Sequence, residues 1–264
     1  MNINSKNEFV EKGFFMIENF FSESEIDEIT KTVDEAQSSI ASGGLESEQK
    51  ETMRLEYFLK SDPKLYSSVI KPDLQKVVKD CLDTQEIFLY KDKYINKSPF
   101  SNAVLHPHFD GIFKSYNYRL KKETFGWRTH ADKFINVAVY LSDNTVENGC
   151  MQIHKKISDD AEYLYENFVD KMKPGSAWIK EEKMKEHNIY ENSFEASGKK
   201  GSIIVFDPKC IHWSGKNETS NRRLNLYLTF NDENGGDAYQ VAQQDKALIL
   251  QNIGQEKFDD LHKK

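Results

Sequence analysis

Cysteine is scarce in this chain, where Cys81, Cys150 and Cys210 are the only three among 264 residues. Three widely spaced thiols suit neither a disulfide framework nor a cysteine-rich zinc site. We expect Cys150 and Cys210, which flank predicted strands, to be buried and inert. No stretch approaches the roughly 18 consecutive apolar residues of a membrane helix. Residues 1–10 also lack the apolar segment of a signal peptide.

Basic residues are in the minority, with 36 Lys and Arg against 43 Asp and Glu, so the formal net charge is −7. Binding to nucleic acid needs clustered cations that neutralise phosphates, and we therefore expect no nucleic-acid partner. Because no membrane or export segment is evident, the sequence predicts a soluble, cytoplasmic protein without a membrane partner.

Aromatic residues are abundant by contrast, at 12% of the chain, with 17 Phe and 12 Tyr. A disordered chain does not carry that many aromatic side chains, so we expect a folded core. No internal repeat or Pro/Ser-rich linker divides the sequence. The length fits one large domain, and we predict a single domain over residues 1–264.

The first part of the chain, residues 1–85, is predicted to be a mostly helical flank. Ser22 and Glu25 form a capping box, in which a Ser cap is followed by an acid three residues later. Apolar residues at helical spacing then predict a helix over about 23–40. Residues 38–49 are small and polar and are expected to form a flexible loop.

The middle and end of the chain are rich in β-branched and aromatic residues, which favour strands. We expect a β core over about 86–154 and 201–235, interrupted by a charged surface insertion of helix and loop at about 155–200. Helices do not alternate with these strands, so a parallel α/β fold is disfavoured. The prediction is a mainly β fold with flanking helices (α+β), a double-stranded β-helix of the cupin-like jelly-roll type. The β-rich runs are residues 87–90, 93–95, 134–141, 203–206 and 224–230.

The most informative short motif is H-x-D, at His108 and Asp110. Residues two apart on a strand point to the same side, so both side chains can reach one metal ion. His106 is in phase with them, although Pro107 makes a regular strand there unfavourable. His212, after a strong apolar strand, supplies a second imidazole. Two His and one carboxylate leave coordination positions open, which is typical of non-haem Fe(II) sites for oxygen chemistry.

Arg223 stands eleven residues after His212, just ahead of a β-rich strand. Its planar guanidinium is a natural bidentate partner for a dicarboxylate cosubstrate. Arg222 competes for that role, but it faces the opposite side if the chain is extended.

The H-x-D motif alone is a weak signal of a metal site. A His paired with a loop carboxylate is the plainer explanation of that motif.

The order and spacing of several motifs resemble the phytanoyl-CoA dioxygenase (PhyH-like) family of Fe(II)/2-oxoglutarate oxygenases, and the resemblance spans most of the chain. The matching stretches are Gly13-Phe14-Phe15-Met16-Ile17 with Phe20-Phe21-Ser22, His108-Phe109-Asp110, Val139-Tyr140-Leu141-Ser142-Asp143 with Glu147-Asn148-Gly149, Gly201-Ser202-Ile203-Ile204-Val205-Phe206-Asp207 leading to His212, and Ser214-Gly215-Lys216-Asn217 with Arg222-Arg223.

The resemblance implies that His108, Asp110 and His212 bind Fe(II) and that Arg223 anchors 2-oxoglutarate. It further implies oxidation of a small-molecule substrate by O₂, release of succinate and CO₂, and stimulation by ascorbate in vitro. Residues 152–157 lack the Pro-Gly-Ser-His stretch of many members. Halogenating relatives carry a small residue in place of Asp110, so its presence points to hydroxylation or a related oxidation.

Further candidates surround these positions. For Asn136, Lys97 and Tyr94, contact with the cosubstrate and a role within a strand are both open, and Ser214 is a candidate for the cosubstrate carboxylate. Substrate contacts are expected, in keeping with the family, in the loop after the first ligand, at Phe109, Phe113, Trp127 and Arg128. With Lys114, this loop mixes aromatic and cationic residues and hints at a polar, carboxylated substrate. Among the other histidines, His130 is a candidate pocket residue or loop histidine, and His154, His187 and His262 are expected at the surface.

Two rival interpretations remain at this point. In the first, the chain is a non-catalytic cupin-like binding protein whose His and Asp residues are structural. In the second, a zinc hydrolase uses the same three ligands, although zinc gives no reason for the position of Arg223.

Overall fold

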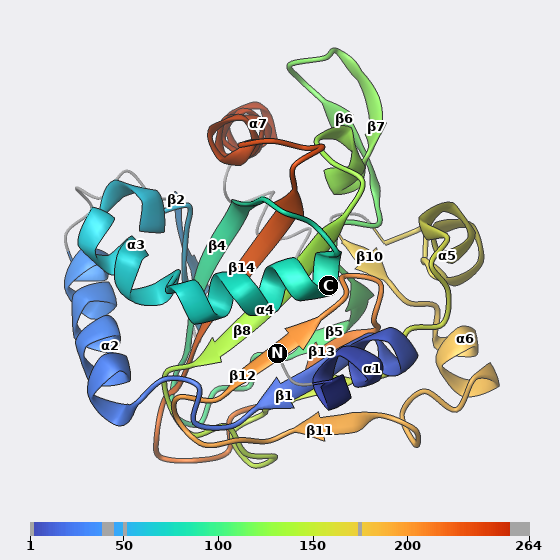
Figure 1. Ribbon diagram of the computed structural model, residues 1–264. Helices are drawn as coiled ribbons and strands as arrows, with labels where there is room; N and C mark the ends of the chain where they lie inside the picture. Colours follow the sequence, from blue (N-terminus) through green and yellow to red (C-terminus); the bar gives the residue numbers. More distant parts are fainter. Residues whose placement is uncertain (1–2, 39–44, 50–51, 174–175, 254–264) are drawn as a thin grey trace.

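Two antiparallel sheets lie face to face in the computed structural model, which describes residues 3–38, 45–49, 52–173 and 176–253 (Figure 1). The helices are α1 (Ile3–Lys12), α2 (Glu23–Ser38), α3 (Pro63–Val69), α4 (Pro72–Leu82), α5 (Ala161–Phe168), α6 (Glu181–Glu186) and α7 (Tyr239–Ile253), with short 3-10 helices η2 (Leu59–Ser61) and η3 (Gly126–Thr129). The strands are β1 (Phe14–Ile17), β2 (Leu45–Gln49), β3 (Thr52–Glu56), β4 (Ile87–Lys97), β5 (Leu105–Phe109), β6 (Lys114–Asn117), β7 (Lys122–Phe125), β8 (Phe134–Tyr140), β9 (Met151–Ile153), β10 (Ala177–Trp178), β11 (Phe194–Ala196), β12 (Ile203–Phe206), β13 (His212–Ser214) and β14 (Arg223–Asp232).

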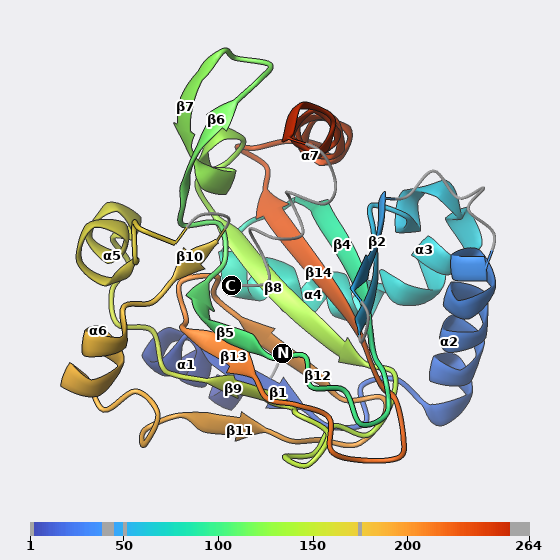
Figure 2. The same cartoon turned by 180° about the vertical axis from the view of Figure 1, so that it is seen from behind.

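The larger sheet has the strand order β1-β12-β8-β14-β4-β3-β2, and the smaller sheet has the order β10-β5-β13-β9-β11. Strands β6 and β7 form a separate hairpin. Helices α2, α3 and α4 lie on one side of the larger sheet, and the smaller sheet lies on the other, as the view from behind shows (Figures 1 and 2). This arrangement is a double-stranded β-helix, and it confirms the predicted fold class.

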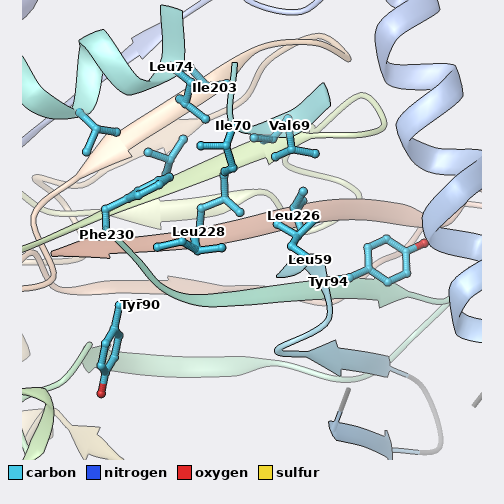
Figure 3. Close-up of a cluster of buried hydrophobic side chains, with 14 of the residues drawn as sticks. Leu59, Val69, Ile70, Leu74, Tyr90, Tyr94, Ile203, Leu226, Leu228 and Phe230 are labelled. Carbon is cyan, nitrogen blue, oxygen red and sulfur yellow. The ribbon is translucent and has the colours of Figure 1, made fainter. Parts of the chain in front are cut away.

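Alternation along β14 decides which side chains face the helices and which face the second sheet. Leu226, Leu228 and Phe230 belong to the core beneath α2, α3 and α4, where Leu226 and Leu228 are fully buried (Figure 3). Because successive side chains on a strand point to opposite faces, Tyr227 and Thr229 face the space between the two sheets. The apolar face therefore fixes the direction of the polar one.

The predicted capping box is present at the start of α2. The Ser22 backbone N–H donates to the Glu25 carboxylate at 2.7 Å, and the Glu25 N–H donates to the Ser22 hydroxyl at 3.3 Å. Lys71, which immediately precedes α4, donates to the same carboxylate at 3.0 Å. These bonds satisfy N–H groups that a helix start leaves unpaired, and they tie α2 to the adjoining helical layer.

The first 85 residues contain α1 to α4, and they also supply β1, β2 and β3 to the larger sheet. Residues 45–49 were expected in a loop and instead form β2, while residues 39–44 of that expected loop lie outside the described residues. Strands as short as β2 and β3 give too few alternating positions to be recognised in sequence, and the pairing of β2 with β3 and of β3 with β4 decides their conformation.

The segment 155–200 is more than a surface insertion of helix and loop, since it supplies two strands to the smaller sheet. Strand β10 pairs with β5, so that Trp178 lies opposite His108, and β11 pairs with β9. The expectation of an exposed His154 was wrong: it follows β9, its N–H donates to the Ile211 carbonyl, and it is buried. His187 is half-buried, and His262 lies outside the described residues.

Cys150 and Cys210 are buried free thiols, as predicted, and burial raises the pKa of both. Within the part of the chain that the structure describes, no helix is long and apolar enough to cross a bilayer.

Replacing Leu228 tests the division of β14 into two faces. Leu228→Ala should lower the free energy of unfolding by about 2–5 kcal/mol, because it leaves a void in a fully buried position. The matched change Leu120→Ala, at a side chain that is 42% exposed, should cost well under half of that. Denaturant unfolding measures both, and equal losses would contradict the assigned burial.

Candidate active site

Three side chains from two neighbouring strands converge between the sheets. His108 lies near the end of β5, Asp110 follows that strand, and His212 opens β13; β5 and β13 are antiparallel, with His108 directly opposite His212. His108 Nε2 is 3.7 Å from Asp110 Oδ1, and His212 Nε2 is 3.6 Å from Asp110 Oδ2. One ligand atom from each residue lies within 4.8 Å of the others, so a single metal ion could bind all three.

Both imidazoles present the same nitrogen to this point. His108 Nδ1 lies 2.9 Å from the His106 carbonyl oxygen, and His212 Nδ1 lies 3.1 Å from the Cys210 carbonyl oxygen. A nitrogen facing a carbonyl must carry the proton, which leaves each Nε2 with its lone pair free. Burial and the neighbouring His212 lower the pKa of His108 to about 3, so the ring is a neutral donor.

The carboxylate of Asp110 is held by a chain of side chains on the larger sheet. Asn136 Nδ2 donates to Asp110 Oδ2 at 2.7 Å, and the Thr229 hydroxyl donates to Asn136 Oδ1 at 2.8 Å. Burial alone would raise the pKa of Asp110, but His212, His108 and Lys93 outweigh it and lower the pKa, so the group is ionised. The donor set of two imidazoles, each presenting Nε2, and one carboxylate fits a divalent metal.

The two adjacent arginines face opposite sides of β14. Arg222 is exposed and pairs with Asp34 of α2, with Nη2 and Oδ2 2.6 Å apart. Arg223 is buried, lines the same cavity as the triad, and donates through Nη1 to the Gly149 carbonyl. Its Nε has no hydrogen-bond partner among the described residues. A buried guanidinium with an unused donor is suited to a carboxylate ligand, and the anchoring role of Arg223 stays a prediction.

Polar groups of neighbouring strands surround Arg223. Lys97 is its register partner on β4, and the Lys97 Nζ lies 3.3 Å from the Ser214 Oγ. Burial, with the nearby charges of Arg223 and Arg54, lowers the pKa of Lys97 to about 7. The hydroxyl of Thr52, the register partner of Lys97 on β3, is also without a partner among the described side chains.

Three sequence candidates lie elsewhere. Tyr94 is on the helical face of β4 and donates to Asp34 Oδ1 at 2.9 Å, with its hydroxyl pointing toward α2 (Figure 3). Of the two roles left open for Tyr94, this position favours the one within the strand, because Tyr94 has the opposite strand phase from Lys97. Arg128 donates to the Gly111 carbonyl at 3.1 Å and does not line the cavity. His106 is exposed, because an irregularity in the β5–β13 pairing breaks its phase with His108.

The space around the triad has two parts. An inner cavity of about 70 Å³ contains His212, Asn136, Ser214 and Arg223, and an outer cavity of about 550 Å³ opens beyond it. His108 and Asp110 line both parts. The inner part thus holds the candidate metal ligands and the buried guanidinium of Arg223, and the outer part offers room for a larger molecule.

Aromatic residues form much of the outer wall. Phe109, Phe113, Trp127 and Trp178 line the outer cavity, and Phe109 also packs against Phe168, with ring centroids 6.3 Å apart. Gly111 has a φ of +63°, and a Cβ there would lie 2.5 Å from the Trp127 ring, so only glycine allows this ring to pack beside the triad.

Helix α7 closes one side of the outer cavity through Asp245. This carboxylate accepts from Asn117 at 3.0 Å and from Arg119 Nε at 2.9 Å, and it lies 3.3 Å from His130 Nε2. The other nitrogen of His130 is 3.1 Å from the Tyr90 hydroxyl. His130 is therefore a pocket residue with fixed partners.

Several cavity residues were not predicted from the sequence: Thr52, Arg54, Lys91, Lys93, Tyr227 and Thr229. The signal that could have found the lysines is the alternation of Lys91, Lys93, Ile95 and Lys97 on β4. A strand that places charge at every second position presents them to one face.

Asn136 should control metal affinity through Asp110. Asn136→Ala removes the bond to Oδ2, and loss of such a partner typically weakens metal binding by about 10–100-fold. Thr229→Val keeps the Asn136 amide that bonds to Asp110 but removes the hydroxyl that donates to Asn136 Oδ1. It should therefore give a smaller loss of metal affinity. Equilibrium dialysis with Mn(II) measures these changes, with the exposed Asn192→Ala as control. Unchanged metal affinity in Asn136→Ala would contradict the inference that Asn136 positions the Asp110 carboxylate for the metal.

Comparisons with known proteins agree with this geometry. Residues 9–225 match the family described as Phytanoyl-CoA dioxygenase (PhyH). A search of curated proteins finds no match.

Solved structures share the fold at low identity. EctD from S. alaskensis, solved with 2-oxoglutarate and 5-hydroxyectoine, is 16% identical, with 89% of this chain and 77% of that one covered at a TM-score of 0.65. The epimerase SnoN of nogalamycin biosynthesis, with Fe³⁺, alpha ketoglutarate and nogalamycin RO, is 14% identical over 87% and 82%, at a TM-score of 0.62. HygX from Streptomyces hygroscopicus, with nickel, 2-oxoglutarate and hygromycin B, is 12% identical over 88% of each chain, at a TM-score of 0.61. The family match covers most of the sequence, and the chain belongs to the phytanoyl-CoA dioxygenase (PhyH) family.

Proposed function

We propose that this protein is a non-haem Fe(II)/2-oxoglutarate-dependent oxygenase that hydroxylates a small organic molecule. The observation that carries the proposal is the convergence of His108, Asp110 and His212 in one cavity with the buried guanidinium of Arg223. Family membership and the ligands named for EctD, SnoN and HygX support the same cofactors.

Each residue has a distinct part in this proposal. The Nε2 atoms of His108 and His212 and the carboxylate of Asp110 would hold Fe(II). Arg223 would bind the distal carboxylate of 2-oxoglutarate, with Lys97 and Ser214 beside it. When bound, Fe(II) and 2-oxoglutarate supply the oxidising chemistry that converts O₂ and 2-oxoglutarate to succinate and CO₂ and oxidises the substrate.

The chain's own contribution is to position the metal-binding side chains and the substrate and to exclude water from the site. Asn136 fixes the Asp110 carboxylate, and the backbone carbonyls of His106 and Cys210 fix the two imidazole tautomers. The aromatic walls of the outer cavity, among them Trp127 and Trp178, would keep the substrate carbon at the triad in a dry environment.

Hydroxylation is the outcome we propose within a family fold that also supports other oxidations, since SnoN is named an epimerase. Asp110 keeps the full set of three protein ligands, which disfavours halogenation. A zinc hydrolase or a non-catalytic binding protein gives no reason for a buried Arg223 with an unused donor beside the triad.

The first test concerns the metal ligands. With Fe(II), ascorbate and 2-oxoglutarate, the protein should show the visible charge-transfer absorption of an Fe(II)–2-oxoglutarate complex and slow formation of succinate without substrate. His108→Gln and Asp110→Ala should lose both, while the exposed His106→Gln should keep both. Retained absorption in His108→Gln, or tight zinc binding that survives iron reconstitution, would contradict the proposal.

The second test separates the two arginines. Arg223→Met should raise the KM for 2-oxoglutarate by at least tenfold, because it removes a buried charge partner of the cosubstrate. Arg222→Met removes only the surface pair with Asp34 and should leave that KM within about twofold. Steady-state succinate formation measures both variants. The opposite pattern would assign the anchor to Arg222.

A further inference from the structure

A second group of cations lines the wall between the inner and the outer cavity. Arg54 of β3 and Lys91 and Lys93 of β4 line both cavities, as His108 and Asp110 do. They lie on one face of three paired strands, where Arg54 is the register partner of Ile95 and Lys93 that of Tyr227. The Lys93 Nζ lies 5.7 Å from the centre of the Tyr227 ring.

This concentration of positive charge is local, because the chain as a whole carries a net charge of −7. Among the described residues, five cationic side chains line the inner cavity, and Asp110 is the one carboxylate there. On the outer side, Glu56 lies 3.5 Å from Lys91 and also pairs with Lys246, and Asp170 and Asp245 line the same cavity. Lys and Arg still outnumber Asp and Glu among the described residues that line the two cavities, so this lining carries excess positive charge.

The proposed cosubstrate does not account for the cluster. Arg223 and Lys97 stand opposite each other at one end of the paired strands, whereas Lys93 is four residues further along β4. At about 3.3 Å per residue, the Cα atoms of Lys97 and Lys93 are roughly 13 Å apart. Lys93 instead lines both cavities together with His108 and Asp110 of the triad.

Resting on the proposed function, we propose that the substrate carries an anionic group, a carboxylate or a phosphate, that Lys93, Lys91 and Arg54 bind at this wall. The body of the substrate then lies against the aromatic side chains of the outer cavity, among them Phe113 and Trp127.

The lysines are suited to this task. Burial and the neighbouring cations lower the pKa of Lys93 to about 7 and that of Lys91 to about 8. An anion between them would favour the charged form of both side chains and relieve their mutual repulsion. The binding site on the rigid strands β3 and β4 would fix the distance between the anionic group and the oxidised carbon.

The test measures binding to the Ni(II)- and 2-oxoglutarate-loaded protein, which does not turn over. Isothermal titration calorimetry compares three probes of similar size: 3-phenylpropionate, phenylethyl phosphate and the neutral 3-phenylpropanamide. At least one anion should bind tenfold or more tightly than the amide, and the better of the two identifies carboxylate or phosphate. Lys93→Met should weaken binding of that anion by at least tenfold and leave the affinity for the amide unchanged.

Two controls keep the result specific. Lys93→Arg should retain the preference for the anion, and Lys199→Met, at an exposed lysine paired with Asp143, should change nothing. The 2-oxoglutarate affinity should stay within twofold in Lys93→Met. Equal binding of the anions and the amide, no binding of any probe, or loss of 2-oxoglutarate affinity in Lys93→Met would overturn the inference. Failure of the wild-type protein to bind 2-oxoglutarate would instead overturn the proposed function.

Discussion

The pairing register between β5 and β13 is the constraint on which the rest of the site depends. It sets His108 opposite His212, and it leaves Asp110 one residue beyond the strand, facing both rings. Backbone carbonyls two residues before each histidine then fix the tautomers. A slip of β13 by one residue would turn His212 to the other face of the smaller sheet, away from His108, so the convergence of the two imidazoles is a consequence of strand pairing.

The larger sheet complements this arrangement because its two faces differ in chemistry. Leucines of β14 anchor one face under the helices, and this burial holds Arg223, Tyr227 and Thr229 toward the triad. The cationic side chains of β3 and β4 would be costly in such a partly buried space without anionic partners. Their retention there is consistent with a cavity built for two anions, the cosubstrate at Arg223 and the substrate at Lys93.

The sequence was sufficient to predict the jelly roll, the convergence of His108, Asp110 and His212, and the direction of Arg223, because each rests on local spacing or strong alternation. Residue type alone left two roles open for Tyr94, and its strand phase, opposite to that of Lys97, directs it to the helical face. Arg54 and Trp178 could not be predicted, since they lie on short strands whose position depends on pairing with β4 and β5. The strand face on which Lys93 lies could be predicted from the alternation along β4. Its role depends on a cavity that forms only when the two sheets pack together.

The most direct test of the account is an anomalous-difference electron density map at the iron absorption edge, from crystals grown anaerobically with Fe(II) and 2-oxoglutarate. We predict one peak within bonding distance of His108 Nε2, His212 Nε2 and an Asp110 carboxylate oxygen, with 2-oxoglutarate extending from it to Arg223. A peak at other side chains, or 2-oxoglutarate bound away from Arg223, would contradict it.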